Sequence, residues 1–268
     1  MITEPYQIIL DVWEGNYLDV NGKIVLDIPY FISQGVSGMI CRINDMQGGH
    51  HDDIYFHQLW DMAFQFRRRA IYFVYNPWVT GIANYNWLAS RLGAMGYAGR
   101  VFTDIEVRYA GYSPLTYYDE VMKYLNLMSG RWPSQTIYTG EWFLSTLSSW
   151  PTNYSYWWGS YPSALNGCPS WNEYKKIIAT LPFGSYNASK CPGPLDLAQM
   201  TGDSYKPVGA FGHAVDTNIF LGTPEKCDTY FGTTAPPIPD PSIKQRLEAQ
   251  VEVLGGCLGA LSDIVRSL

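Results

Sequence analysis

The chain has 268 residues, which suits either two average domains or one large barrel or sandwich with a small addition. Charged side chains make up 16% of it and the net charge is −6, so no nucleic-acid partner is expected. No apolar run approaches the roughly 20 residues that span a bilayer, so no membrane span is expected. Aromatic residues reach 16%, and their flat faces suit a packed core or the face of a sugar ring.

Short β-branched and aromatic runs, each bounded by Gly, Pro, Asn or Asp, predict strands along the whole chain. The eight predicted strands are 6–13, 38–44, 70–76, 100–107, 134–140, 154–162, 195–202 and 214–220. Apolar residues that return every three or four positions predict helices between the early strands. These helices are expected at 28–34, 54–68, 84–95, 114–128 and 142–149. Strands that alternate with helices predict an α/β fold with a parallel, closed or nearly closed barrel.

The last three predicted strands have little helix between them, so a regular eightfold barrel is not expected. The exception is the long connection 162–194, in which Trp171–Leu181 has helical spacing. Connections of this length are usually lids or binding loops.

The composition changes after residue 231. We expect a barrel in residues 1–231, a Pro-rich linker in 232–241 and an amphipathic helix in 242–268, where apolar residues alternate at spacings of four and three. One alternative is a terminal helix that packs back on the barrel. We favour a coiled coil that forms a homo-oligomer or docks to a partner, because the linker separates this helix from the barrel.

Five cysteines stand without CxxC spacing or a neighbouring histidine, so buried thiols are expected rather than a zinc site. Cys168 and Cys191 flank one segment, and the sequence leaves open whether they pair. The four histidines have no spacing that favours a metal centre, so neither a metal nor a cofactor is expected.

Two acidic residues, Asp104 and Glu106, end the fourth predicted strand. Side chains of a strand alternate between its faces, so both acids point to the same side, and the barrel mouth is where they cost least. The first strand delivers Asp11 and the last delivers Asp216. Because the first and last strands of a closed barrel are neighbours, we expect four carboxylates in one cleft at the carboxyl ends of the strands.

Carboxylates that gather in one cleft repel one another, so the pKa of at least one of them rises. This supplies the protonated carboxyl that general acid catalysis at a glycosidic oxygen requires. Glycoside hydrolysis uses paired carboxylates and no cofactor. For an isolated Asp-x-Glu motif, a strand cap or an ion pair with Arg108 would be the simpler interpretation. Asp11, Asp216 and the aromatic residues together favour hydrolysis, and a metal-dependent barrel is the weaker alternative.

Nine motifs occur in a fixed order between residues 8 and 222. They are Leu10–Val12, Phe31–Val36 with Met39–Arg42, Asp53–Phe56, Tyr72–Tyr75, Thr103–Glu106, Thr136–Thr139, Tyr156–Tyr161, Leu197–Met200 and Val215–Phe220. Their order resembles that of the glycoside hydrolase family 25 lysozymes, the Chalaropsis-type N-acetylmuramidases that are common as phage endolysins.

The resemblance implies a TIM-like (β/α)5(β)3 barrel that cleaves the β-1,4 bond between N-acetylmuramic acid and N-acetylglucosamine in peptidoglycan. It implies that Glu106 is the proton donor and that Asp104 stabilises the developing positive charge or positions the acetamido group. Asp11 and Asp216 would be supporting acids. The expected sugar-binding residues are Tyr75, Tyr138, Trp157, Gln199 and Trp13, whereas Tyr72, Phe73 and Trp142 are expected in the core.

Three departures from the family pattern concern substrate contacts more than the acids. Trp13–Asn16 stands where the family has Ser and Gln, Val74 replaces a histidine, and Ala198 replaces a tryptophan. These changes bear on which glycan is cut rather than on hydrolysis itself. The competing function is a catalytically weak or inactive carbohydrate-binding or structural module of a phage particle or cell-surface assembly. No secretory signal is expected at the start. We expect a phage lysin that stays in the cytoplasm until release, or a virion component, acting on the bacterial cell wall.

Overall fold

The computed structural model describes residues 6–19, 21–45, 49–181, 188–202, 209–210 and 214–232. These residues belong to one compact unit. The predicted linker beyond Gly232 and the predicted helix 242–268 lie outside the described residues, so the coiled coil stays a prediction. No described helix is both long enough and apolar enough to cross a membrane.

Eight strands close into a mixed barrel. They are β1 (Gln7–Val12), β2 (Val36–Arg42), β5 (Arg68–Val74), β6 (Val101–Asp104), β7 (Gln135–Gly140), β8 (Ser155–Gly159), β9 (Leu195–Thr201) and β10 (Asp216–Phe220). Their order around the barrel is β1-β10-β9-β8-β7-β6-β5-β2, and β2 returns to β1. All neighbours are parallel except β10, which runs antiparallel to both β1 and β9. The predicted α/β barrel and its eight strands are confirmed.

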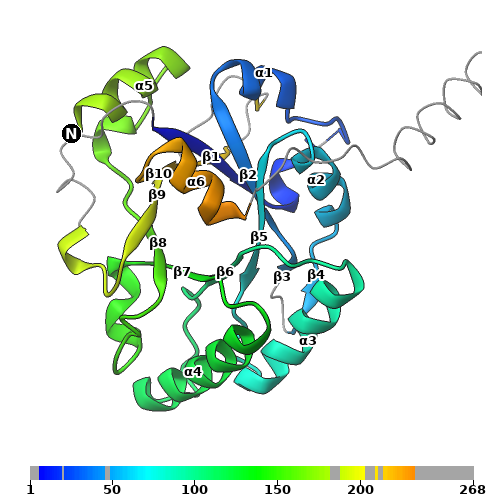
Figure 1. Ribbon diagram of the computed structural model, residues 1–268, viewed down its shortest axis with the longest axis vertical. Coiled ribbons are helices and arrows are strands. Elements are labelled where there is room, and N and C mark those ends of the chain that lie inside the picture. The colour runs from blue at the N-terminus through cyan, green and yellow to red at the C-terminus, as the bar shows by residue number, and fades with distance from the viewer. Residues whose placement is uncertain are drawn as a thin grey trace, which may run out of the picture. The chain divides into compact units, whose positions relative to one another are not determined.

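The α-helices among the described residues are α1 (Ile28–Ser33), α2 (Phe56–Ala63), α3 (Gly81–Ala94), α4 (Pro114–Arg131), α5 (Trp171–Thr180) and α6 (Pro224–Phe231). The helices α1 to α5 lie around this barrel and α6 lies across one of its ends (Figure 1). The helix expected at 142–149 is instead the 3-10 helix η2 (Glu141–Thr146), and α6 was not predicted. The remaining short elements are η1 (Glu14–Asn16), η3 (Ser163–Leu165), η5 (Ala188–Lys190) and the hairpin of β3 (Asn44–Asp45) and β4 (His51–Asp52).

Hydroxyl caps start the longer helices. The side chains of Thr80, Ser113 and Ser170 each accept a hydrogen bond from a backbone N–H in the first turn of α3, α4 and α5. The same arrangement, Thr223 followed by Pro224, begins α6. Such caps satisfy backbone donors that would otherwise lack partners, which explains why these helices begin where they do.

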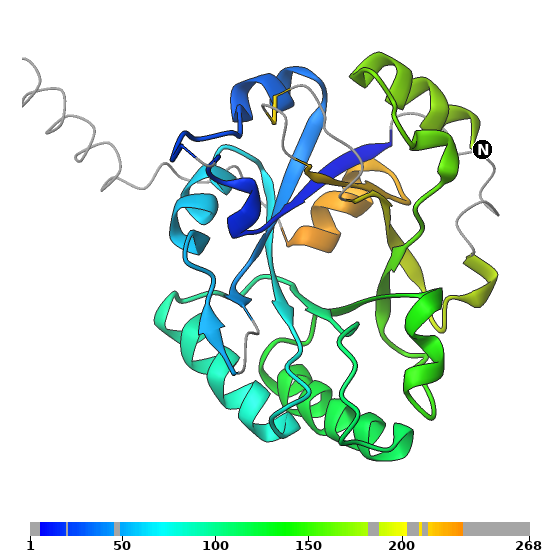
Figure 2. The same ribbon diagram turned by 180° about the vertical axis from the view of Figure 1, so that it is seen from behind.

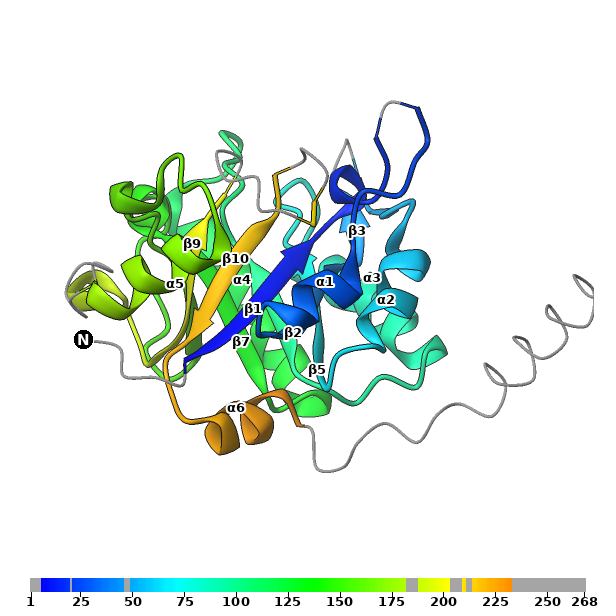
Figure 3. The ribbon, with the colours of Figure 1, turned by 90° about the horizontal axis from the view of Figure 1, so that it is seen from above.

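The helix α6 covers the end of the barrel at which β1 begins (Figure 3). Its Tyr230 and Phe231 pack on Phe102 of β6, with ring centroids 6.0 and 5.9 Å apart. Arg68 at the start of β5 donates to Asp228 at 2.7 Å and anchors the helix. Figure 2 shows the barrel from the opposite end. Because α6 and the aromatic rings close one end of the barrel interior, the interior cavity opens toward the other end.

Gly81 allows α3 to approach α4 closely. A Cβ at this position would overlap the carbonyl oxygen of Glu120 and lie 3.1 Å from the backbone nitrogen of Tyr124. We expect Gly81→Ala to lower the free energy of unfolding by roughly 1–3 kcal/mol in urea titrations, because backbone atoms cannot move aside. Gly130→Ala in the last turn of α4 is the matched control, since nothing lies within 4 Å of its added Cβ. An equal loss in both variants would contradict this account of the helix contact.

Candidate active site

A cavity of about 590 Å³ opens at the end of the barrel opposite α6. Eight of the nine predicted site residues line it: Asp11, Trp13, Asp104, Glu106, Tyr138, Trp157, Gln199 and Asp216. They come from β1, β6, β7, β8, β9 and β10 and from the residues that follow β1 and β6. Residues from both ends of the sequence therefore meet in one place.

Tyr75 is the predicted residue that does not reach the cavity. The strand β5 ends at Val74, and the side chains of Tyr72 and Val74 line the cavity. The alternation of side chains then turns Tyr75 toward the helices. It is fully buried, with ring centroids 6.0 Å from Tyr117 and 5.5 Å from Tyr124 of α4. Its burial contradicts the expected sugar contact, whereas Tyr72, which is buried in the core as expected, also lines the cavity.

Asp11 and Asp216 face each other as partners in the register of β1 and β10. Asn218 Nδ2 donates to Asp11 Oδ2 at 2.7 Å, and Gln199 Nε2 donates to Asp216 Oδ2 at 2.7 Å. Burial raises the pKa of Asp11 to about 7 and Glu106 adds to the rise, while the bond from Asn218 opposes it. Because β10 is antiparallel, Asp216 lies at the start of its strand and not at the carboxyl end that was expected.

Asp104, like Asp11, is buried, whereas Glu106 and Asp216 are partly exposed. Asp104 is only 6% exposed, and its Oδ1 is buried without a hydrogen-bond partner in the described part of the chain. Burial raises the pKa of Asp104 well above its ordinary value, Glu106 and Asp11 raise it further, and Arg42 lowers it. This carboxyl therefore has an oxygen available to a ligand group.

Glu106 lies just beyond the end of β6 and is partly buried. Burial raises its pKa to about 7, and a hydrogen bond with the side chain of Trp142 opposes the rise. Near neutral pH this carboxyl holds its proton for much of the time. The cavity thus holds a carboxyl that can be protonated near neutral pH together with other carboxyls that can carry negative charge.

Gln199 orders the polar wall of the cavity. Its Oε1 accepts hydrogen bonds from the hydroxyls of Tyr138 and Tyr161, the latter at 2.7 Å. Its Nε2 therefore faces Asp216, which fixes the orientation of the amide. Trp157 is only 2% exposed, and its Nε1 donates to Asn218 at 2.7 Å. Trp157 accordingly packs in the barrel interior. Its contact with Asn218, which donates to Asp11, supports the acids, and its ring has little exposed surface for a sugar.

Tyr161 and Trp142 are site residues that the sequence analysis missed. Tyr161 lines the cavity with a backbone φ of 43°, a left-handed conformation that is uncommon for a bulky residue. Its ring lies 5.5 Å from that of Trp142 at an angle of 31°. Trp142, expected in the core, is 43% exposed and lies over Gly140 and Gly159, where any Cβ would collide with the indole. In the sequence, the glycines that end β7 and β8 were the signal that a large side chain lies against this surface.

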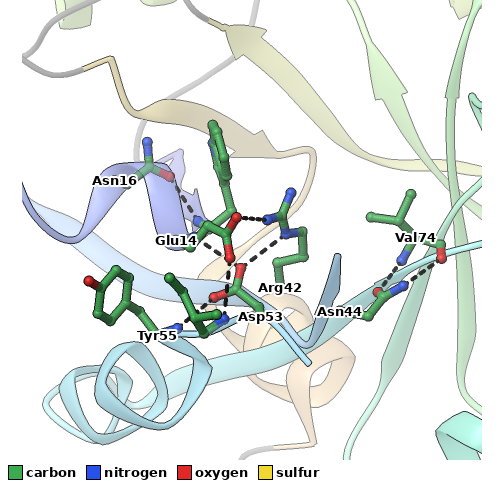
Figure 4. A network of polar contacts seen from close by, with 9 residues as sticks. Glu14, Asn16, Arg42, Asn44, Asp53, Tyr55 and Val74 are labelled. Atoms are coloured by element: carbon green, nitrogen blue, oxygen red, sulfur yellow. Dashed lines mark hydrogen bonds and ion pairs between the residues drawn. The ribbon is translucent and has the colours of Figure 1, made fainter. Parts of the chain in front are cut away.

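Arg42 is the third missed residue, and it lines the cavity beside Trp13. Its Nε donates to Asp53 Oδ2 at 3.0 Å, and its Nη2 lies 3.6 Å from Glu14 Oε1 (Figure 4). The guanidinium carbon is 4.7 Å from the ring centroid of Trp13. The ends of strands β1 and β2 are therefore tied together at the rim.

Metal-ligating side chains do not assemble in the part of the chain that the structure describes. No group of three His, Cys, Asp or Glu residues is placed there to hold a metal ion. Among the described cysteines, Cys41 and Cys227 are buried, and Cys168 and Cys191 are partly exposed and not bonded to each other.

Comparison with solved structures identifies the fold. A family 25 glycosyl hydrolase from Bacillus anthracis matches with a TM-score of 0.57 over 86% of this chain and 96% of its own, at 14% identity. A lysozyme from Streptomyces coelicolor matches with a TM-score of 0.61 over 87% and 100%, at 16% identity. The autolysin LytC from Streptococcus pneumoniae, solved in complex with a synthetic peptidoglycan ligand, matches with a TM-score of 0.54 over 81% and 47%, at 16% identity. The chain thus has the (β/α)5(β)3 barrel fold of the family 25 lysozymes.

No protein-family model matches the sequence, and no curated protein matches it. The likeness that the motif order predicted is therefore established by the fold across most of the chain.

The raised pKa of Asp104 predicts a stability that depends on pH. A buried carboxyl with a raised pKa opposes folding once it ionises, so stability is lost as pH rises through the pKa of the folded state. We expect Asp104→Asn to be more stable than the wild type by on the order of 1–3 kcal/mol at about pH 8 and by less at about pH 5. Urea titrations at both pH values measure this. Asp52→Asn, an exposed neighbour of the network, is the control. A difference between Asp104→Asn and the wild type that does not change with pH would contradict the buried charge.

Proposed function

We propose that the protein is a peptidoglycan hydrolase that cleaves the β-1,4 bond between N-acetylmuramic acid and N-acetylglucosamine. The observation that carries the proposal is the pair Glu106 and Asp104, one with a pKa of about 7 and the other buried with an unpartnered oxygen, in one cavity. The family 25 fold supports it, because solved structures of that fold include lysozymes.

In the proposed mechanism Glu106 protonates the glycosidic oxygen as the bond breaks. A pKa near the working pH suits a general acid, because the protonated form is populated and still acidic enough to transfer its proton. Asp104 stabilises the positive charge that develops on the sugar ring, or positions the acetamido group. The Asp11 and Asp216 carboxyls extend the negative field of the cavity. Hydrolysis by carboxyl groups needs no cofactor.

The remaining lining residues are proposed to hold the sugar. Trp13 is 37% exposed and offers a ring face at the rim. The Tyr138 and Gln199 side chains present polar atoms from the wall. A peptidoglycan substrate agrees with the synthetic ligand bound to LytC, which shares the fold. The alternative, a binding module without turnover, is an outcome of the following experiment.

Replacing the proposed proton donor tests the enzymatic function. We expect Glu106→Gln to lower the rate of hydrolysis by about 10²–10⁴-fold, because the amide cannot donate a proton to the leaving oxygen. Turbidity clearing of cell-wall suspensions and release of reducing ends measure the rate. Glu173→Gln on the exposed surface of α5 is the matched control and should keep full activity. If neither wild type nor Glu106→Gln clears walls while both bind them, the protein is a binding module.

The pKa of Glu106 also predicts the pH dependence of the rate. The protonated form decreases as pH rises through about 7, so kcat/KM should fall there. Rates with a soluble chitooligosaccharide or with cell walls, measured between about pH 4 and about pH 9, test this limb. A rate that still rises above about pH 8 would show that Glu106 is not the acid.

A further inference from the structure

The loop after β6 carries Glu106 at its start and a group of aromatic side chains at its end. Val107 lines the cavity, and two residues further along, the ring centroid of Tyr109 lies 5.9 Å from that of Trp78, which follows β5. Tyr112 adds a third ring, whose centroid is 5.1 Å from that of Tyr109. We call Trp78, Tyr109 and Tyr112 the outer aromatic cluster. It lies beyond the carboxyl ends of β5 and β6, the end of the barrel at which the cavity opens, but outside the cavity lining.

The rings of the outer aromatic cluster are not enclosed by the core. Trp78 is 48% exposed, and the two tyrosines are partly exposed. The ring of Tyr109 lies over Gly111, where an added Cβ would be 2.5 Å from the ring carbon Cζ. At the cavity rim the indole of Trp13 lies over Gly15 in the same way. A glycine lets a ring approach the backbone closely, so the backbone supports the ring at both positions.

Contacts on both sides fix the loop between the acid and the cluster. The Tyr117 hydroxyl of α4 donates to the carbonyl of Val107 at 2.6 Å. Arg108 Nη2 donates to the carbonyl of Trp142 in η2 at 2.9 Å. Because the loop is tied to α4 on one side and to η2 on the other, the fold sets the position of the cluster relative to the acid.

Two buried asparagines hold the segment that carries Trp78. Asn76 Oδ1 accepts from the backbone N–H of Trp78 at 2.9 Å. The backbone N–H of Asn76 donates to Asn84 Oδ1 at 2.9 Å, and Asn84 Nδ2 donates back to the carbonyl of Asn76 at 2.9 Å. The backbone of Trp78 is therefore fixed against α3 before any ligand arrives, while its indole stays exposed.

The cavity is too small to enclose a polymer. Its volume of about 590 Å³ is that of a site for a small molecule, so a glycan strand cut at Glu106 would continue over the rim. Tyr109 follows Glu106 by so few residues that their Cα atoms lie at most about 11 Å apart. The outer aromatic cluster is therefore within reach of a strand that leaves the cavity on this side.

We propose that the outer aromatic cluster binds the glycan strand outside the cavity, by contact with sugar rings several units from the bond that is cut. Aromatic side chains offer flat faces of the kind on which sugar rings pack, and exposed ones keep that face accessible. This inference rests on the proposed function and adds a preference for long glycan chains over short ones. Trp78 and Tyr109 bind the strand and take no part in cleaving it.

The dependence of affinity on chain length tests this role. Isothermal titrations would use chitotriose and chitohexaose with the full-length chain carrying Glu106→Gln, so that the ligand stays intact. We expect Trp78→Ala and Tyr109→Ala each to lower the affinity for chitohexaose by about three- to tenfold, the size of one lost aromatic contact. The affinity for chitotriose should fall by less, because the shorter chain ends before the cluster.

Leu127→Ala, an exposed apolar residue of α4, is the matched control and should leave both affinities unchanged. Trp78→Phe and Tyr109→Phe keep a ring at each position, so they should retain most of the preference for chitohexaose. They also keep the test decisive where an alanine variant does not fold. Equal losses for the two oligosaccharides, or no loss for either, would overturn the proposal.

The indole N–H signal of Trp78 in NMR spectra gives a second readout that needs no turnover. The signal is assigned by its loss in Trp78→Phe, and it should shift with chitohexaose and stay in place with chitotriose. A shift in a protein that never clears cell walls would refute the proposed function and leave this inference standing. An active enzyme whose Trp78 signal does not respond to chitohexaose, or a chain that does not bind chitohexaose, would refute the inference.

Discussion

Carboxyl groups that share a buried cavity repel one another and lose their hydration, so each needs a proton or a compensating donor. In the described part of the barrel, only some of the carboxyls receive a hydrogen bond from a neighbouring side chain. Amide side chains on β9 and β10 donate to Asp216 and Asp11, whereas Asp104 keeps an oxygen without a partner. Burial raises the pKa of Asp11 and Glu106 to about 7 and that of Asp104 well above its ordinary value, so these carboxyls keep protons at a higher pH than free carboxyls do, and the proposed chemistry uses such a proton.

The antiparallel direction of β10 places the compensating donors. The strand starts at the cavity with Asp216, and the period of two brings Asn218 to the same interior face. Asn218 then donates to Asp11 across the strand pair and accepts from Trp157. A parallel final strand would present its last residues at the cavity instead. The mixed topology is therefore part of the site, in addition to closing the barrel.

Local patterns were sufficient to predict the barrel and most of the site. Alternation along 100–107 placed Asp104 and Glu106 together, and all eight strands were recognised by their apolar runs. Tyr75 was assigned to the cavity from the family resemblance, whereas the alternation that places Tyr72 and Val74 at the cavity turns Tyr75 toward the helices. The identity of η2 as a 3-10 helix and the existence of α6 depend on packing against the barrel, which a single-chain pattern does not contain.

The residues that escaped prediction all depend on contacts between distant segments. Arg42 is defined by Asp53 and Glu14, and Trp142 by glycines on two strands. Two groups of the aromatic residues lie at opposite ends of the barrel. Phe102, Tyr230 and Phe231 fill the α6 end of the barrel, whereas Trp13 and Trp142 stand exposed near the acids. Packing of the barrel interior also buries the carboxyls, which lowers their hydration and raises the pKa values of Asp11 and Glu106. Composition thus contributes to the electrostatics of the cavity as well as to the stability of the barrel.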